Sequence, residues 1–133
     1  MPWLWRIVGS PAANDIIAEL RGVWSSGGVI HGMIFSLYGF FICHDDTARH
    51  SYVIETYREG TDETRTFIRV TLPPERPFIK LVSPDEPLIV GIGQWTGSYW
   101  EHLRVRSIEG GEPHVTVGLL VRGRYDQVTD MFG

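Results

Sequence analysis

The run from Val23 to Cys43, "VWSSGGVIHGMIFSLYGFFIC", contains no Asp, Glu, Lys or Arg. An uncharged run of this length is either buried in protein or inserted in a membrane, and as a helix it would be long enough to span a bilayer. Glycines, serines and His31 lower its hydrophobicity, however, and the chain that follows alternates like a water-soluble sheet. We therefore expect buried strands joined by a glycine-rich turn, and no membrane partner.

Beyond residue 28 the apolar positions recur with a period of two, which is the period of a β-strand. Segments 50–58 and 64–72 flank the turn-forming "EGTDE" and predict a hairpin. Its second strand should have a dry and a wet face: Thr66, Ile68, Val70 and Leu72 against Arg65, Phe67 and Arg69. Further short strands are predicted at 78–83 and 88–93, and the spacing suggests a meander.

The region near the N-terminus predicts a helix. Ser10 is a favourable N-cap, and Pro11 stands at the first helical position. Apolar residues then recur at helical spacing: Ala13, Ile16, Ile17, Leu20 and Trp24. We expect an amphipathic helix from residue 11 to about residue 22, preceded by a short first strand in "WLWRIV".

The segments 102–108 and 114–122 predict a second hairpin around "EGGEP". A connection made of residues 109–113 would align Leu103 with Leu119 and Val105 with Val117, so that apolar residues share one face. The opposite face would carry Trp100, His102, Arg104, Arg106, His114, Thr116, Arg122 and Arg124. This register gathers arginines and histidines on one side of the sheet.

Taken together, these patterns predict a single α+β domain over residues 1–133. One N-terminal helix would pack on a mostly antiparallel and strongly curved sheet. The sheet would form a barrel or half-barrel of about seven or eight strands, because open edges and one apolar face must both be covered.

Charge and cysteine content limit the partners and the compartment. The formal net charge of −4 disfavours nucleic acid as a partner. Cys43 is the only cysteine and cannot form an internal disulfide, and the N-terminal segment lacks the continuous apolar core of an export signal. We therefore expect a cytoplasmic protein.

The stretch "FFICHDDTARHSYVIE", residues 40–55, places Cys43 and two histidines close to two aspartates. The simplest interpretation is a turn between strands, since Asp favours turns by bonding nearby amides. The alternative is an acid–base site in which His44, Asp46 and His50 meet across the turn. We expect no metal, because Cys43 and His44 would point to opposite faces of a strand. We expect no cofactor either, since the glycines of residues 91–97 lack the spacing of a dinucleotide-binding loop.

The residues that favour ligand binding are aromatic and cationic. Trp95, Tyr99 and Trp100 lie among flexible glycines, where large rings often line a pocket, although they are also suited to fill a core. Guanidinium groups on paired strands suit a carboxylate or phosphate, and the predicted ligand-binding arginines are Arg104, Arg106, Arg122 and Arg124. The plainer interpretation of these arginines is a solvated sheet face on which they pair with acids.

Three functions are compatible with these features, and whether the protein is an enzyme stays open. The first is a binding domain that holds a partly apolar anionic small molecule or peptide. The second is a small cofactor-free isomerase, cyclase or hydrolase, in which His31, His44 or His102 acts as general base and an aspartate such as Asp46 orients it. The third is a protein-interaction or assembly module that uses exposed edges and aromatic residues and forms a homo-oligomer or binds a fixed partner.

Overall fold

The described chain is built from β-strands alone. The computed structural model describes residues 3–45, 48–74, 78–93, 100–109 and 114–123, except for the side chains of residues 24–26, 30 and 100. Sheet A contains, in spatial order, β1 (Trp3–Gly9), β11 (His114–Gly123), β5 (Ile34–His44) and β8 (Phe78–Val82), and β9 (Ile89–Gly93) also pairs with β5. Sheet B contains β2 (Ile16–Arg21), β10 (Trp100–Ser107), β6 (His50–Glu59) and β7 (Glu63–Leu72). A separate two-stranded hairpin consists of β3 (Val23–Ser26) and β4 (Val29–Gly32).

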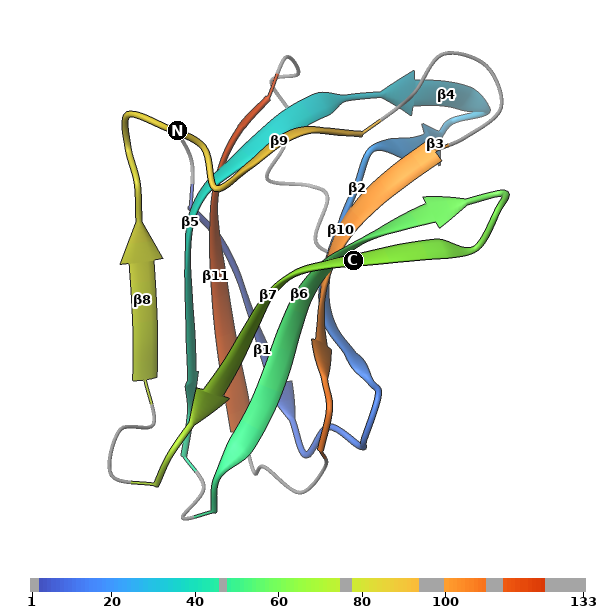
Figure 1. The fold of residues 1–133 in the computed structure, drawn as a ribbon. Helices are drawn as coiled ribbons and strands as arrows, with labels where there is room; N and C mark the ends of the chain where they lie inside the picture. Colours follow the sequence, from blue (N-terminus) through green and yellow to red (C-terminus); the bar gives the residue numbers. More distant parts are fainter. Residues whose placement is uncertain (1–2, 46–47, 75–77, 94–99, 110–113, 124–133) are drawn as a thin grey trace.

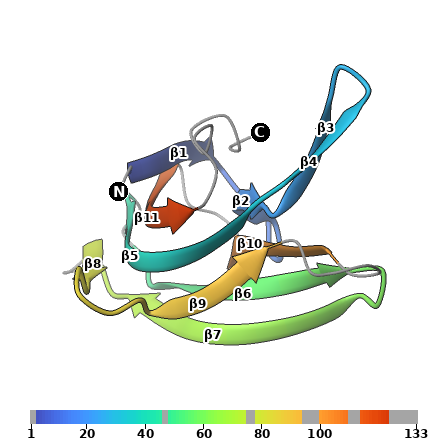
Figure 2. The same ribbon diagram turned by 90° about the horizontal axis from the view of Figure 1, so that it is seen from above.

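Sheets A and B stack face to face and form a β-sandwich (Figure 1, Figure 2). Alternate residues of each strand point into the space between the sheets, and they form one buried cluster. Sheet A contributes Phe35, Leu37, Phe40, Ile42 and Leu119, and sheet B contributes Leu20, Tyr52, Ile54, Leu103 and Val105. Burial of each large apolar side chain stabilises the fold by roughly 1.5–3 kcal/mol.

The expected N-terminal helix over 11–22 is wrong, since these residues form a turn followed by β2. Ser10 and Asn14 have left-handed backbones, with φ of 48° and 66°. The Asp15 carboxylate accepts a hydrogen bond from the amide of Ala12 at 2.7 Å, which closes a local turn instead of starting a helix. The described residues include no helix that could span a lipid bilayer.

A β-bulge explains why β2 resembled a helix in sequence. The pairing of β10 with β2 shifts between Val105 and Arg106, which leaves Ile17 as an extra residue. Ile17 and Ala18 are consequently both buried, each 1% exposed, and Leu20 is buried as well. The resulting order of apolar residues matches helical spacing, although the strand is extended.

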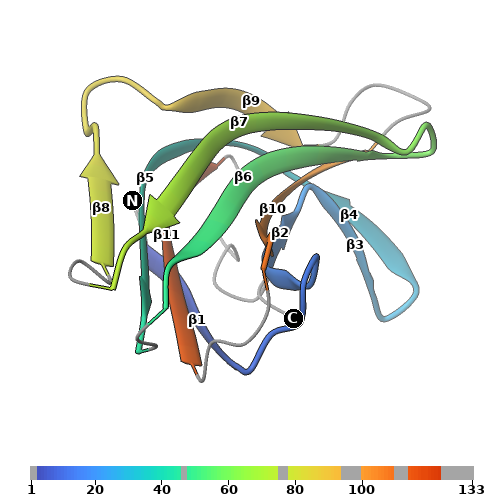
Figure 3. The same cartoon turned by 60° about the horizontal axis from the view of Figure 1, so that its bottom comes forward.

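The barrel or half-barrel is also contradicted, because neither sheet closes on itself (Figure 3). The β6–β7 hairpin is confirmed, with Ile54 opposite Ile68 and Tyr52 opposite Val70. Most other consecutive strands belong to different sheets, so the arrangement is not a meander. In particular, the segment after Cys43 connects β5 of sheet A to β6 of sheet B and is not a hairpin turn.

The predicted pairing of residues 102–108 with residues 114–122 is wrong. Strand β10 pairs with β2 and β6, and β11 pairs with β1 and β5. The apolar residues Leu103 and Leu119 are both fully buried, but they lie in opposite layers of the sandwich. Alternating apolar and polar residues indicate which face of a strand is buried. They do not indicate which strand is its neighbour in the sheet.

Two glycines allow the backbones to cross closely where β2 ends and β9 ends. The Met33 amide donates to the Gly22 carbonyl at 2.8 Å. A Cβ on Gly22 would overlap the Glu101 carbonyl oxygen and the Gly93 Cα, and a Cβ on Gly93 would overlap the Met33 carbonyl oxygen. Gly93 also has a φ of 135°, which L-residues rarely adopt. Only glycine fits at either position.

The substitution Gly93→Ala tests this crowding, with Gly91→Ala as its matched control on the same strand. Gly91 also has a positive φ, of 63°, but a Cβ there would meet no atom within 4 Å. We expect Gly93→Ala to lower the free energy of unfolding by about 2 kcal/mol more than Gly91→Ala, because only the former adds a steric overlap. Urea unfolding of both variants measures the difference, and equal losses would contradict the crowded crossing.

Candidate functional site

The outer face of sheet B carries the cationic residues that the sequence singled out on β10. Because side chains alternate, His102, Arg104 and Arg106 point away from the core, while Leu103 and Val105 point into it. The flanking strands supply acids at the neighbouring outer positions: Glu19 on β2, and Glu55 and Glu59 on β6. The arginines of this face therefore stand among carboxylates.

Glu55 neutralises both arginines. Its side chain is 0% exposed, and its Oε1 lies 2.6 Å from the Nε of Arg106 and 3.4 Å from the Nε of Arg104. Arg106 also donates from Nη1 to the Asn14 side chain at 2.8 Å. A carboxylate buried between two guanidinium groups compensates their charge locally. The sequence predicts that Arg104 and Arg106 bind an anionic ligand. In the structure they instead pair with an acid of the chain itself, as the plainer interpretation of these arginines expects.

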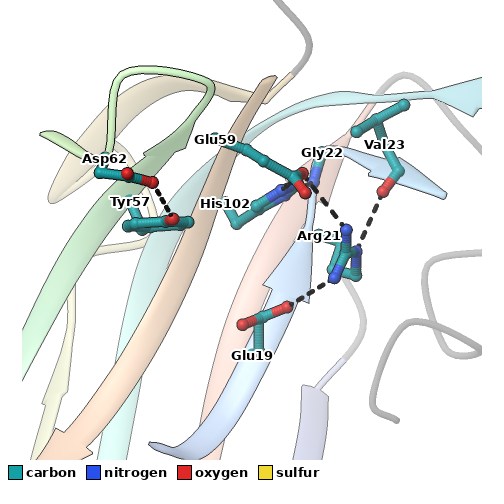
Figure 4. Close-up of polar contacts among 8 residues, drawn as sticks. All are labelled: Glu19, Arg21, Gly22, Val23, Tyr57, Glu59, Asp62 and His102. Atoms are coloured by element: carbon teal, nitrogen blue, oxygen red, sulfur yellow. Dashed lines mark hydrogen bonds and ion pairs between the residues drawn. The ribbon is translucent and has the colours of Figure 1, made fainter. Parts of the chain in front are cut away.

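Tyr57, on β6, lies on the outer face of sheet B close to the β6–β7 turn. The Arg104 guanidinium lies 4.7 Å from the centre of the Tyr57 ring. The Tyr57 hydroxyl donates to Asp62 Oδ1 at 2.6 Å (Figure 4). This hydrogen bond to the carboxylate raises the pKa of Tyr57 above its ordinary value of 10.0, because it favours the protonated phenol. Tyr57 is therefore held as a hydrogen-bond donor.

His102 is bonded through both ring nitrogens. Its Nδ1 accepts from the amide of Gly22 at 3.0 Å, so the ring proton lies on Nε2, which is 2.9 Å from Glu59 Oε2. Glu59 also pairs with Arg21, which in turn contacts Glu19 and donates to the Val23 carbonyl at 3.2 Å (Figure 4). The side chain of His102 is 2% exposed. In this geometry no nitrogen is left for a general base, and the ring holds the chain at Gly22.

Arg122 does not join the other arginines. It lies on β11 of sheet A, opposite Ser36 on β5, whereas Arg104 and Arg106 lie on sheet B. The prediction that these arginines gather on one face is therefore wrong. Arg122 instead borders an open hollow of about 360 Å³, lined by Ile34, Phe35, Ser36, Tyr38, Gly91, Arg122 and Gly123.

The two histidines of the 40–55 stretch do meet. His44 and His50 are 6% and 5% exposed, and their ring centroids are 5.4 Å apart in an edge-to-face arrangement. His50 Nδ1 also lies 3.9 Å from Glu109 Oε2. Within the described residues, no group of three or more His, Cys, Asp or Glu side chains is placed to hold a metal.

Several predicted site residues lie outside the described residues. They are Asp46, Trp95, Tyr99 and Arg124, and for Trp100 only the backbone, as the first residue of β10, is described. The acid–base partner of His44 and the aromatic group around residue 97 therefore stay predictions.

The outer face of sheet A carries a surface that the sequence reasoning missed. Three cross-strand rows run over β1, β11, β5 and β8 on this side. They are Trp3, Leu120, Gly39 and Val82; Trp5, Gly118, Phe41 and Lys80; and Ile7, Thr116, Cys43 and Phe78. We call these twelve residues the aromatic face. Its exposed members include Trp5 at 71%, Ile7 at 69% and Phe78 at 54%.

Phe41 organises the aromatic face. Its ring lies over Gly118, where a Cβ would overlap it. The ring centroid is 5.7 Å from that of Trp3 and 6.2 Å from that of Phe78, and Lys80 Nζ is 5.8 Å from the Trp3 ring. Such spacings are typical of interacting aromatic pairs. The rings thus form a continuous layer across the sheet.

The aromatic face differs from the outer face of sheet B in charge. The five strands of sheet A contain no aspartate or glutamate, whereas each strand of sheet B contains at least one glutamate. The signal in the sequence is "WLWRIVG", in which large apolar residues occupy both strand faces. A strand of this kind is buried on both sides or leaves one apolar side exposed.

Comparisons with known proteins give no family for this chain. No protein-family model matches it, and neither does any curated protein. One solved structure, "Structure of infectious bursal disease virus Gx strain", aligns with 14% identity and a TM-score of 0.20. The alignment covers 99% of this chain and 39% of that chain, so the present chain spans well under half of the viral one. A TM-score this low does not indicate a shared fold.

The substitution Glu55→Gln tests the buried charge compensation. Removing the charge leaves Arg104 and Arg106, 16% and 25% exposed, without their shared carboxylate. We expect the free energy of unfolding to fall by about 2 kcal/mol, less than for a fully buried pair because water reaches both arginines. The control Glu63→Gln removes a carboxylate that is 67% exposed and should cost about 0.5 kcal/mol or less. Chemical denaturation measures the free energy of unfolding of both variants. Similar losses would contradict a stabilising role for the buried Glu55 charge.

Proposed function

We propose that this chain is a non-catalytic assembly module that self-associates through the aromatic face. The observation that carries the proposal is the layer of rings on sheet A in which Trp3, Phe41 and Phe78 contact one another, with Trp5 exposed in the same row as Phe41. Single exposed apolar residues are common on protein surfaces, but contiguous apolar patches mark interaction sites. Aromatic residues are also enriched at protein–protein interfaces.

The small number of charges on the aromatic face supports a second copy as its partner. Lys80 is its only charged member, and its ammonium group lies against the Trp3 ring. A surface with one charge has little means of selecting a charged partner by ion pairing, so it fits another apolar surface. The uncharged run Val23–Cys43 contributes Gly39, Phe41 and Cys43 to this surface.

The bonding of His102 supports a non-catalytic role. A general base needs a ring nitrogen within reach of substrate, and both nitrogens of His102 are engaged by Gly22 and Glu59. The hollow beside Arg122 contains no histidine. Neither His102 nor the hollow therefore supplies a general base, and we favour association as the function.

Self-association predicts a mass in solution that rises with protein concentration. The substitution Trp5→Thr removes the most exposed ring of the aromatic face and should weaken association at least about tenfold, because interface aromatics commonly contribute 2 kcal/mol or more. Phe67→Thr is the matched control, since Phe67 is 40% exposed but lies on sheet B. Sedimentation velocity and light scattering measure the mass. A wild-type chain that stays monomeric up to millimolar concentration would refute the proposal.

A second candidate function rests on the hollow beside Arg122. Its wall combines Ile34, the Tyr38 ring and the Ser36 hydroxyl with a guanidinium that forms no ion pair within the described chain. A second hollow, of about 230 Å³, has Arg58 paired with Glu63 at 3.4 Å and with Glu101 at 3.7 Å. Only the first hollow offers an uncompensated cation beside an apolar wall. That combination suits a small carboxylate with an apolar body.

Phenylacetate is a suitable probe for this second function, with phenylacetamide as its uncharged analogue. We expect saturable chemical-shift changes with phenylacetate, and Arg122→Gln should weaken binding about tenfold, since hydrogen bonds to charged groups contribute roughly 1.5–3 kcal/mol. Arg69→Gln, on exposed sheet B surface, is the control. NMR titration measures both variants. Equal binding of the acid and the amide would exclude an anion site.

A further inference from the structure

The hairpin of β3 and β4, residues 23–32, is an arm that belongs to neither sheet. Its strands pair only with each other, from Val23 opposite Gly32 to Ser26 opposite Val29. It extends away from the two-sheet body (Figure 2). At its tip, Gly27 and Gly28 have φ of 58° and 78°, and a Cβ on either would meet no atom within 4 Å. We call residues 23–32 the arm.

The arm is uncharged and partly exposed. Residues 23–32 contain no Asp, Glu, Lys or Arg, and Val29 is 55% exposed. An isolated two-stranded hairpin with apolar residues is only marginally stable in water unless one of its faces is covered. Within the described chain, β3 and β4 contact each other most, and β3 also contacts β10. Its composition therefore fits an apolar surface outside its own copy.

The base of the arm is held by the polar network of sheet B. His102 accepts a hydrogen bond from the Gly22 amide, and Arg21 donates one to the Val23 carbonyl (Figure 4). The Met33 amide donates to the Gly22 carbonyl. These bonds fix both strands of the arm where they leave the body. Such fixing lowers the conformational entropy that the arm would lose on binding.

The arm lies far from the β8 edge of the aromatic face within one molecule. Strand β8, which borders the aromatic face, and the arm lie at opposite sides of the body in all three views (Figure 1, Figure 2, Figure 3). The sizes agree, because two four-residue strands measure about 13 Å by 5 Å, and four strands of sheet A are about 14 Å across. A neighbouring copy can therefore bring its arm onto this face.

We propose that the arm of one copy packs on the aromatic face of the next, so that copies associate head to tail. This inference rests on the proposed self-association and names the second element of its contact. Both surfaces are nearly uncharged and present on every copy, which is the requirement for such a contact. Because the two surfaces differ, the contact is heterologous and yields a ring or a filament, unlike a two-fold contact between two aromatic faces.

The experiment combines two variants, each of which damages one side of the contact. Val29→Lys places a charge on the arm, and Trp5→Thr removes a ring from the aromatic face. Each variant alone should show at least tenfold weaker association. Mixed in equal amounts they should form a 1:1 heterodimer and nothing larger, because each retains the surface that the other lacks. Phe67→Lys is the control for adding a lysine at an exposed apolar position, and thermal unfolding checks that every variant folds.

The outcomes separate the inference from the proposed function. A monomeric wild-type chain refutes both. If the wild type associates and Trp5→Thr disrupts it, but Val29→Lys does not, the face binds another face and only the head-to-tail inference is overturned. If both variants are impaired but their mixture forms no heterodimer, the inference is likewise overturned. A variant in which residues 24–31 are replaced by Asn-Gly gives an independent test that removes the arm entirely.

Discussion

Close approach of three backbone segments, at the end of β2, the start of β5 and the end of β9, determines how the rest of the molecule is arranged. Here the Gly22 carbonyl accepts from Met33, and the absence of a side chain at Gly22 and Gly93 lets the segments touch. The chain leaves sheet B at this point, forms the arm and enters sheet A. The same point fixes His102, because its Nδ1 bonds the Gly22 amide. The close approach at Gly22 thus explains both where the arm leaves the body and why the Nδ1 of His102 is engaged.

The two outer faces of the sandwich are opposite in character, and this difference organises the functional argument. On sheet B, carboxylates stand beside every cation of β10, and Glu55 is buried between two arginines. On sheet A, no acid occurs in any strand, and Lys80 is the one charged member of the aromatic face. Water solvates the first face well and the second poorly. A protein with this asymmetry is expected to meet partners through sheet A.

Sequence reasoning predicted the β6–β7 hairpin and several strands correctly, because alternation with a polar turn is a local signal. It failed at Ile17, where a bulge buries two consecutive residues and imitates a helix. It also failed for Leu103 and Leu119, because burial of alternate residues is the same for strand neighbours and for residues facing each other across a core. The aromatic face escaped notice because Trp5, Phe41 and Phe78 are far apart in sequence and meet only through strand order.

The single thiol of the chain lies inside the aromatic face, in the row that contains Ile7 and Phe78. It is partly accessible in one isolated copy. Any macromolecule seated on the rings would shield this sulfur from alkylating reagents, whereas one bound to sheet B would leave it open. The rate at which Cys43 is alkylated in the native protein therefore shows whether a partner covers the outer face of sheet A. The measurement requires no substitution.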